Sequence, residues 1–476
     1  MRRTSGGTPR RSARAVTATA TAASAGTETG ACGVTMVGLA MAFAVAAAVG
    51  CVPDVPRDPV PEEMDYDLQS VPPRAPQPTN LVVNKATGHV DFSLAGISVA
   101  TDCATSQTLS QAECELDQYL QSLDGFPTVT PASAPASAPL DPATLTLGQN
   151  VVVLDATTGA PVTDVTVGFD TVGNQLTVKP TRSWALGGKY WIGVRGYASG
   201  VRAASGSEVV GSPTHALFKQ DSSLTCGAEP PADIRSDCPG LKLLSQTMTP
   251  MAAAMALFQL EPIRLAYQLG GGFELMAAAG LPKDELAVLW GFPIHTSSVA
   301  ELDPTVGLVP RVTAANELHV AVQGTVNPAT VTAVAVMQKP GSVLLMDLTA
   351  AAGGDLVSGF PRADAAYAAG DIVITAAAPF VAGHQYGVFI TNAVLDTGGA
   401  PLVPSPVSVL LTLKGALVDT AGHSTISTVG DSDAAMLDVG RRQLATLFDN
   451  PVFQPLTGVS RANLVYCFAF PFGGTP

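Results

Sequence analysis

Charged residues are scarce in this chain of 476 residues, where Asp, Glu, Lys and Arg together make up only 13% of the sequence. An average soluble domain carries about 25%. Disordered chains combine high charge with few apolar residues, so this composition, with 47% hydrophobic residues, excludes a disordered protein. Basic residues are the scarcer kind, 25 against 39 acidic ones. The net charge of -14 argues against nucleic-acid binding, which requires a basic surface.

Histidine is scarce as well. The six histidines are spread so widely that no helix or turn presents two of them together. Zinc sites need closely spaced ligands, and none of the seven cysteines shows CxxC spacing. The sequence therefore predicts no bound metal and no cofactor.

A complete GxSxG motif, the nucleophile elbow of α/β-hydrolases, is also missing. Residues 422–426 (GHSTI) and 458–462 (GVSRA) come closest, but both lack the final glycine. Neither has a histidine after it, as the hydrolase order requires. We interpret Ser424 and Ser460 as turn residues and predict a protein that is not an enzyme, with no catalytic residues.

The amino terminus shows the features of a secretory signal in their usual order. Arginines open the chain, and an uncharged apolar run fills residues 31–50. The run ends in Ala48-Val-Gly-Cys51, which resembles the lipobox of bacterial lipoproteins, although that family usually has leucine in place of Ala48. The resemblance implies lipidation of Cys51 and, through Val52, sorting to the outer membrane. The alternative is a transmembrane signal anchor, because about 20 apolar residues can span a bilayer.

The remaining cysteines indicate an oxidising compartment. Cys103 and Cys114 enclose one polar segment, and Cys226 and Cys238 enclose another. Short-range pairs of this kind in an exported protein predict two disulfides. Cys467 lies in an apolar run and is predicted to be a buried free thiol.

Internal repetition is the strongest signal in the mature chain. Three pairs of segments align without gaps: 280–293 with 458–471, 140–145 with 326–331, and 185–190 with 381–386. Arg264 and Arg442 align at the spacing of the first pair, inside apolar periodic stretches. The chain therefore contains one unit twice, with loops of different length.

Each unit combines short strands with a helical segment. Short β-branched or aromatic runs such as 151–154, 190–194 and 386–390 alternate with Gly, Pro, Asn and Asp, which predicts strands of a β-sandwich. Residues 250–279 and 433–449 have helical spacing, and Gly270-Gly-Gly272 interrupts the first of them.

These motifs resemble the bacterial Ig-like domain named after the S-layer protein SbsA. The helical stretch followed by GLPKDELAVLWGF is similar to the N-terminal, non-catalytic region of bacterial virulence-factor lipases. The resemblance implies a mainly β fold with two tandem Ig-like β-sandwich domains and interleaved helical segments. The expected order is a signal peptide (1–50), a lipidated cysteine with a Pro-rich linker (51–79), the first sandwich (80–240), a helical segment (241–285), the second sandwich (286–415), a helical segment (416–461) and a terminal strand (462–476).

Aromatic residues supply one candidate binding surface. Trp191 points away from the face that carries Tyr190 and Ile192, and Trp184 and Tyr197 lie nearby in the sequence. Such residues can stack on a glycan or anchor a protein partner. The alternative is that they pack against the adjacent helical segment.

Taken with the lipobox, these features predict a non-catalytic, exported, outer-membrane lipoprotein with a structural, adhesive or binding role. Its expected partners are the membrane, through the lipid, and a protein or glycan ligand. The alternative function is the accessory N-terminal half of a surface lipase or esterase that has lost, or is separated from, its hydrolase domain.

Overall fold

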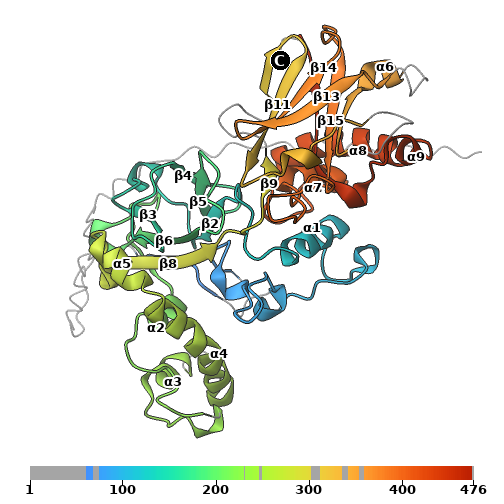
Figure 1. Ribbon diagram of the computed structural model, residues 1–476. Helices are drawn as coiled ribbons and strands as arrows, with labels where there is room; N and C mark the ends of the chain where they lie inside the picture. The colour runs from blue at the N-terminus through green and yellow to red at the C-terminus, as the bar shows by residue number, and fades with distance from the viewer. Residues whose placement is uncertain are drawn as a thin grey trace, which may run out of the picture. The chain divides into compact units, whose positions relative to one another are not determined.

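The computed structural model describes residues 60–67, 74–229, 231–245, 249–301, 311–334, 341–352 and 359–473 (Figure 1). The chain divides into residues 1–57 and residues 58–476, and the description below concerns the second unit. The predicted signal, Cys51 and the first part of the predicted linker lie outside the described residues. Among the described helices, none is both long and apolar enough to cross a membrane.

The protein is mainly β, as predicted, and its sheets are antiparallel apart from one two-stranded pair. In the first repeat, β2 (Ala132–Pro135), β5 (Gln175–Pro180) and β4 (Val165–Asp170) form one three-stranded sheet in that order. A second sheet has the order β3 (Val151–Asp155), β6 (Lys189–Arg195) and β8 (Leu286–Pro293). The apolar residues of both sheets belong to one hydrophobic core.

The second repeat contains the same two kinds of sheet. One consists of β10 (Arg311–Ala314), β11 (Glu317–Gln323), β14 (Asp371–Ala376) and β13 (Ala363–Ala368), with β9 (Val299–Glu301) also paired to β11. The other has the order β12 (Val343–Asp347), β15 (Gln385–Thr391) and β16 (Leu464–Pro471). Buried side chains from both of these sheets form a core that is separate from the core of the first repeat. The duplication predicted from the sequence therefore extends to the strand order.

The strand that follows each helical segment returns to the sheet of its own repeat. Tyr190 pairs with Phe292 in the first repeat, and Tyr386 pairs with Phe470 in the second. The prediction assigned residue 286 to the start of the second sandwich and residues 462–476 to a separate terminal strand. The pairing corrects both boundaries, because residues 286–293 complete the first repeat and residues 464–471 complete the second. The physical reason is burial: both strands are apolar runs that need cover on two faces, which a sheet in the preceding core provides.

Helices lie between the strands in both repeats. The first helical segment contains α2 (Pro213–Phe218), α3 (Pro239–Leu244), α4 (Pro250–Leu269) and α5 (Gly272–Ala278). The second repeat has α6 (Leu348–Ala352), α7 (Pro406–Thr412), α8 (Asp431–Phe448) and α9 (Phe453–Thr457). The helix α1 (Gln111–Gln121) precedes the first sheet and packs its Ala112 and Leu116 against α7 of the second repeat.

The described part of the predicted linker belongs to the folded body, which corrects the prediction of a tether reaching residue 79. The strand β1 (Glu62–Met64) pairs in parallel with β7 (Val209–Gly211). Met64 and Tyr66 are fully buried, and the Tyr66 hydroxyl forms a 2.9 Å hydrogen bond with the hydroxyl of Tyr267 in α4. The prediction failed because the Pro-rich, acidic composition of this segment outweighed its few apolar residues, which are the ones that become buried.

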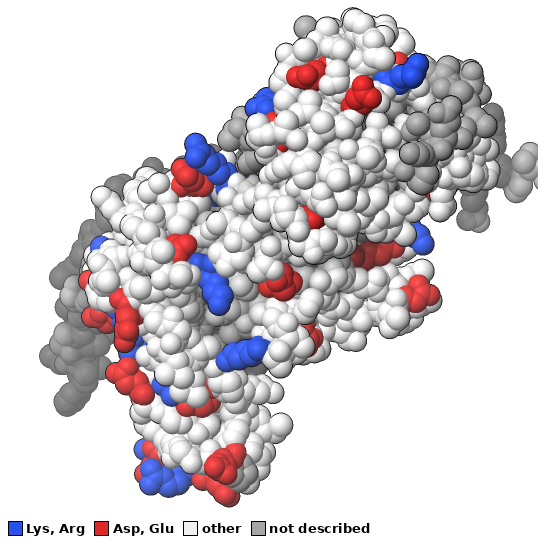
Figure 2. Space-filling view, in the orientation of Figure 1, with Lys and Arg blue, Asp and Glu red and all other residues white. Residues whose placement is uncertain are grey.

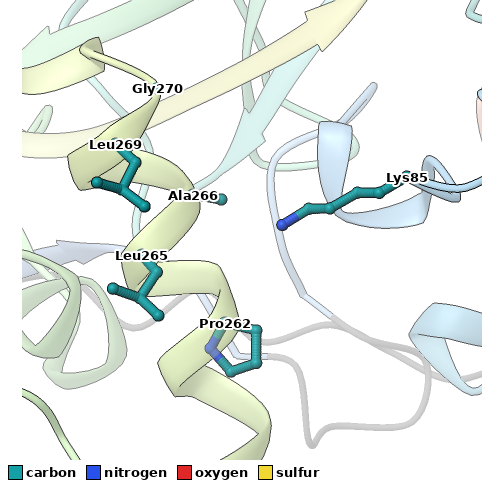
Figure 3. Close-up of a pocket in the computed structure, with 6 residues that line it drawn as sticks. All are labelled: Lys85, Pro262, Leu265, Ala266, Leu269 and Gly270. Atoms are coloured by element: carbon teal, nitrogen blue, oxygen red, sulfur yellow. The ribbon is translucent and has the colours of Figure 1, made fainter.

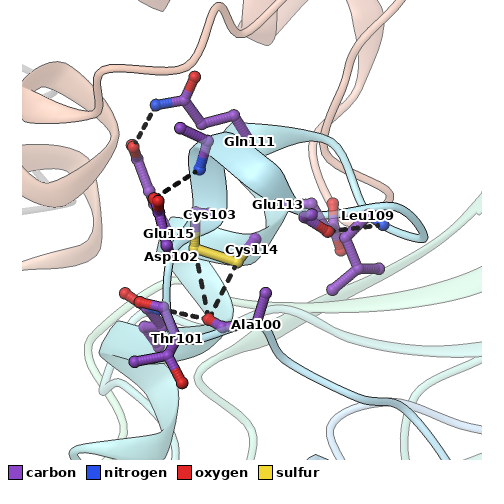
Figure 4. The surroundings of a disulfide bond; sticks show 12 residues. Ala100, Thr101, Asp102, Cys103, Leu109, Gln111, Glu113, Cys114 and Glu115 are labelled. Carbon is purple, nitrogen blue, oxygen red and sulfur yellow. Dashed lines mark hydrogen bonds between the residues drawn. A yellow bond between two sulfur atoms is a disulfide. The ribbon is translucent and has the colours of Figure 1, made fainter.

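Both predicted disulfides are present. Cys103–Cys114 links a short 3-10 turn to the start of α1 (Figure 4), and Cys226–Cys238 closes the loop before α3. Cys467 is free and buried in β16, as predicted. These local bridges restrict loops that contain little regular structure.

Candidate interaction surface

The aromatic residues predicted as a binding surface do not form one. Trp184 and Trp191 are only 3% and 5% exposed. The Trp184 indole N–H donates to the backbone carbonyl of Thr130 at 2.9 Å. Tyr197 is half-buried, and the Lys219 ammonium lies 5.1 Å from the centre of its ring. The alternative prediction, packing against the helical segment, describes Trp191 correctly.

Glycines make room for the Trp191 ring. A Cβ placed on Gly272 would lie 3.1 Å from the indole, and one placed on Gly291 would lie 2.6 Å from it. Gly271 has a positive φ of 70°, which a residue with a side chain adopts at a cost. The predicted break at residues 270–272 is therefore the turn between α4 and α5, and it covers the outer face of β6.

The two serines of the hydrolase-like fragments make local contacts. The Ser424 hydroxyl donates to the carbonyl of Ile426 at 2.9 Å, while its backbone N–H donates to Asp431. His423 contacts Asp431 at 3.0 Å through Nδ1, but no hydrogen bond joins it to the Ser424 hydroxyl. Ser460 caps the 3-10 turn at Arg461–Asn463. Within the described residues, no three His, Cys, Asp or Glu side chains are placed to hold a metal ion.

A buried ion pair occurs at the same place in both repeats. Arg264 of α4 contacts Glu261 through two nitrogens, at 2.9 and 2.8 Å, and also donates to the carbonyl of Gln220. In α8, Arg441 contacts Asp438 at 2.8 Å and lies near the carbonyls that end α7. The partner of Arg264 is thus Arg441, which corrects the sequence alignment with Arg442 by one residue.

The acid of each pair holds a loop as well as the arginine. A Glu261 oxygen accepts the backbone N–H of Leu224 at 2.8 Å, and an Asp438 oxygen accepts that of Leu417 at 3.1 Å. Hydrogen bonds to Arg264 and Leu224 lower the pKa of Glu261, although burial opposes them. These side chains are structural, since they face the loops that follow α2 and α7.

The opposite side of α4 is apolar and exposed. The exposed apolar side chains, together with the half-buried Phe258, follow one another at intervals of three or four residues. They therefore form one stripe along the helix. They are Met251, Met255, Pro262, Leu265 and Leu269. The charged residues of α4, Glu261 and Arg264, face inward, and the part of Figure 2 that α4 forms is mostly white. We call this stripe the outer face of α4.

A groove with a volume of about 480 Å³ runs beside the C-terminal half of this face (Figure 3). Pro262, Leu265, Ala266 and Leu269 line one side, and Lys85 extends toward it from the opposite side. Lys85 is exposed. The groove is therefore apolar on the side of α4 and has one exposed ammonium group on the other.

The equivalent side of α8 is more polar, which makes the second repeat an internal reference. When Arg441 is aligned with Arg264, the exposed positions of Met255, Leu265 and Leu269 correspond to Ser432, Arg442 and Thr446, which are also exposed. Val439, opposite Pro262, stays apolar, and the exposed Met436 lies beside this side of the helix, opposite Gln259. The fold therefore forms with a less apolar outer face. Sequence reasoning missed this surface because α4 is apolar on its buried side as well.

Comparison with known proteins adds little to this geometry. No family model matches the sequence, and no curated protein is similar to it at a significant level. Among solved structures, the N-terminal part of the bacterial S-layer protein SbsC matches 40% of this chain and 35% of its own, with 12% identity and a TM-score of 0.16. A longer piece of SbsC matches 40% of this chain and 20% of its own, with 12% identity and a TM-score of 0.18. The chain thus spans about a third or less of the length of these proteins.

Proposed function

We propose that this chain is a non-catalytic lipoprotein of the bacterial outer membrane, with a structural or adhesive body built from two Ig-like repeats. The observation that carries the proposal is the lipobox-like sequence Ala48-Val-Gly-Cys51, placed directly before a folded body that begins by residue 62. Cys103–Cys114 and Cys226–Cys238 support export, because disulfides persist in oxidising compartments.

The duplicated sheets support the Ig-like assignment. Each repeat pairs one sheet of the β2-β5-β4 kind with one of the β3-β6-β8 kind, and all these strands are antiparallel. Each also has a tyrosine whose hydroxyl accepts a backbone N–H five residues upstream, Ala185 to Tyr190 at 3.0 Å and Val381 to Tyr386 at 2.9 Å. Two copies of one rigid unit suit a spacer or an adhesive surface better than a catalytic cleft.

Cys51→Ser should move the protein from the membrane fraction to the soluble fraction, because a hydroxyl cannot take the thioether-linked lipid. Cell fractionation followed by immunoblotting measures the change. Cys32→Ser is the matched control, since Cys32 lies inside the predicted signal and should be removed with it. If Cys51→Ser stays in the membrane, the apolar run is a signal anchor and the lipoprotein proposal is wrong.

The purified protein should not hydrolyse short-chain esters above the rate of buffer. The reason is that the Ser424 hydroxyl and the Ser460 backbone bond within their own turns, and among the described residues no histidine is hydrogen-bonded to either serine hydroxyl. Turnover that disappears in Ser424→Ala or Ser460→Ala would contradict the non-catalytic assignment. Turnover that appears only after a hydrolase is added would favour the alternative role of an accessory to a surface lipase.

A further inference from the structure

We propose that the outer face of α4 lies on the lipid surface of the membrane, next to the anchor, and sets the orientation of the body. This inference rests on the proposed lipidation of Cys51. The face consists of Met251, Met255, Pro262, Leu265 and Leu269, with Lys85 across the groove.

The composition of the face suits lipid. At 1.5 Å per residue, a helix of the length of α4 is about 30 Å long. No Asp or Glu is exposed on this stripe, although acidic residues outnumber basic ones in the chain by 39 to 25. An amphipathic helix lies in the membrane interface with its apolar side toward the acyl chains. Lys85 can reach a lipid phosphate while its methylene groups stay against the apolar surface.

The internal reference shows that this composition is not a requirement of the fold. The helix α8 has the same acid–arginine pair, yet its outer side carries Ser432, Arg442 and Thr446 beside the apolar Met436 and Val439. Packing within the repeat therefore explains the inner sides of both helices but not the apolar outer side of α4.

The length of chain between Cys51 and the body limits how far the body can lie from the lipid. Cys51 and Val60 are nine residues apart in the sequence, which limits their separation to about 30 Å even when the chain is fully extended. From Val60 the chain enters β1 and then Tyr66, whose hydroxyl bonds to Tyr267 of α4 at 2.9 Å. The first described residues after the anchor therefore contact the buried, inner side of α4, whose other side is the outer face.

The short tether also explains why a modest apolar stripe is sufficient. The acyl chains supply the membrane affinity. The apolar face therefore needs only enough binding energy to favour one orientation of the body among those that the tether allows. A face of this size would bind vesicles weakly without the anchor.

The test places a fluorescent label on the outer side of α4 and on the equivalent side of α8. Leu269→Cys and Thr446→Cys are matched, since both positions are exposed near the end of the corresponding helix. In the acylated full chain the native thiols are protected: Cys51 by lipid, four by disulfides, and Cys467 by burial. Each variant is labelled with bimane and reconstituted into vesicles of phosphatidylethanolamine and phosphatidylglycerol that contain nitroxide-labelled lipid.

Roughly half of the bimane fluorescence at position 269 should be quenched by the nitroxide lipid, as expected for a group at the interface, and that at position 446 should hardly change. Equal quenching at the two positions overturns the proposal. A blue-shifted label at position 269 that lipid does not quench also overturns it, because the face would then be covered by a second copy of the chain. Vesicle flotation reports the anchor separately. A chain that does not float refutes the lipidation and this proposal with it, whereas a chain that floats with equal quenching refutes only the orientation.

Discussion

Arg264→Leu should lower the free energy of unfolding of the first repeat by about 2–4 kcal/mol, because it leaves the half-buried Glu261 carboxylate without its arginine. The Arg264 side chain is only 5% exposed and donates to Glu261 as well as to the carbonyls of Gln220 and Asp221. Those carbonyls also lose their donor. Urea unfolding followed by tryptophan fluorescence measures the effect, since all three tryptophans lie in the first repeat.

Two further variants separate charge from packing. The double variant Glu261→Gln with Arg264→Leu should be more stable than Arg264→Leu alone, because no unpaired charge remains in the buried site. Arg235→Ala removes an arginine whose side chain is 71% exposed and should cost less than about 1 kcal/mol. If Arg264→Leu is as mild as Arg235→Ala, the ion pair does not hold the loop after α2.

Asp117→Asn should stabilise the protein at alkaline pH and have little effect at acid pH. Burial, and secondly the Glu113 carboxylate, raise the pKa of Asp117 to about 7 from its ordinary value of 3.8. The unfolded chain therefore releases this proton at lower pH than the folded one does. The stability that the protonated Asp117 contributes is full below about pH 4 and is lost as the pH rises through 7.

Between about pH 5 and about pH 8.5, the advantage of Asp117→Asn over the unaltered protein should grow by about 2–3 kcal/mol. Asp117 lies in α1, which contacts the second repeat: Glu113 accepts from Ser427, and the Tyr119 hydroxyl donates to the carbonyl of Pro404. Urea unfolding at both pH values measures the difference. Glu274→Gln, at an exposed position of α5, should leave it unchanged, and an equal effect in both variants would contradict the assignment to Asp117.

Local features of the fold could be predicted because they depend on nearby residues. The runs at 151–154 and 190–194 became strands, the glycines at 270–272 became a turn, and each pair of cysteines closed a loop whose ends are near in the sequence. The repetition itself was visible because segments such as 280–293 and 458–471 keep the same apolar positions.

Long-range pairing could not be predicted in the same way. The residues of 286–293 do not indicate whether this apolar strand joins the sheet before it or the sheet after it. In the structure it pairs with β6 of the preceding sheet. The same limit applied to Trp191: alternation placed it correctly on the side opposite Tyr190, but only the structure shows that α4 and α5 cover that side. Tyr66 was hidden in a Pro-rich segment, although its ring is fully buried.

The candidate site was predicted least well, for a related reason. An exposed stripe on a helix is recognised by its contrast with a polar side, and α4 offers little contrast because its inner side is also apolar. Comparison with α8 supplies the missing reference, and that comparison requires the register set by Arg264 and Arg441.

The most direct test of the lipoprotein assignment is the mass of the N-terminal peptide of the protein extracted from membranes. The expected chain begins at Cys51 and carries acyl groups on that residue. A chain that begins before residue 51, or one that begins at an unmodified Cys51, would contradict the assignment.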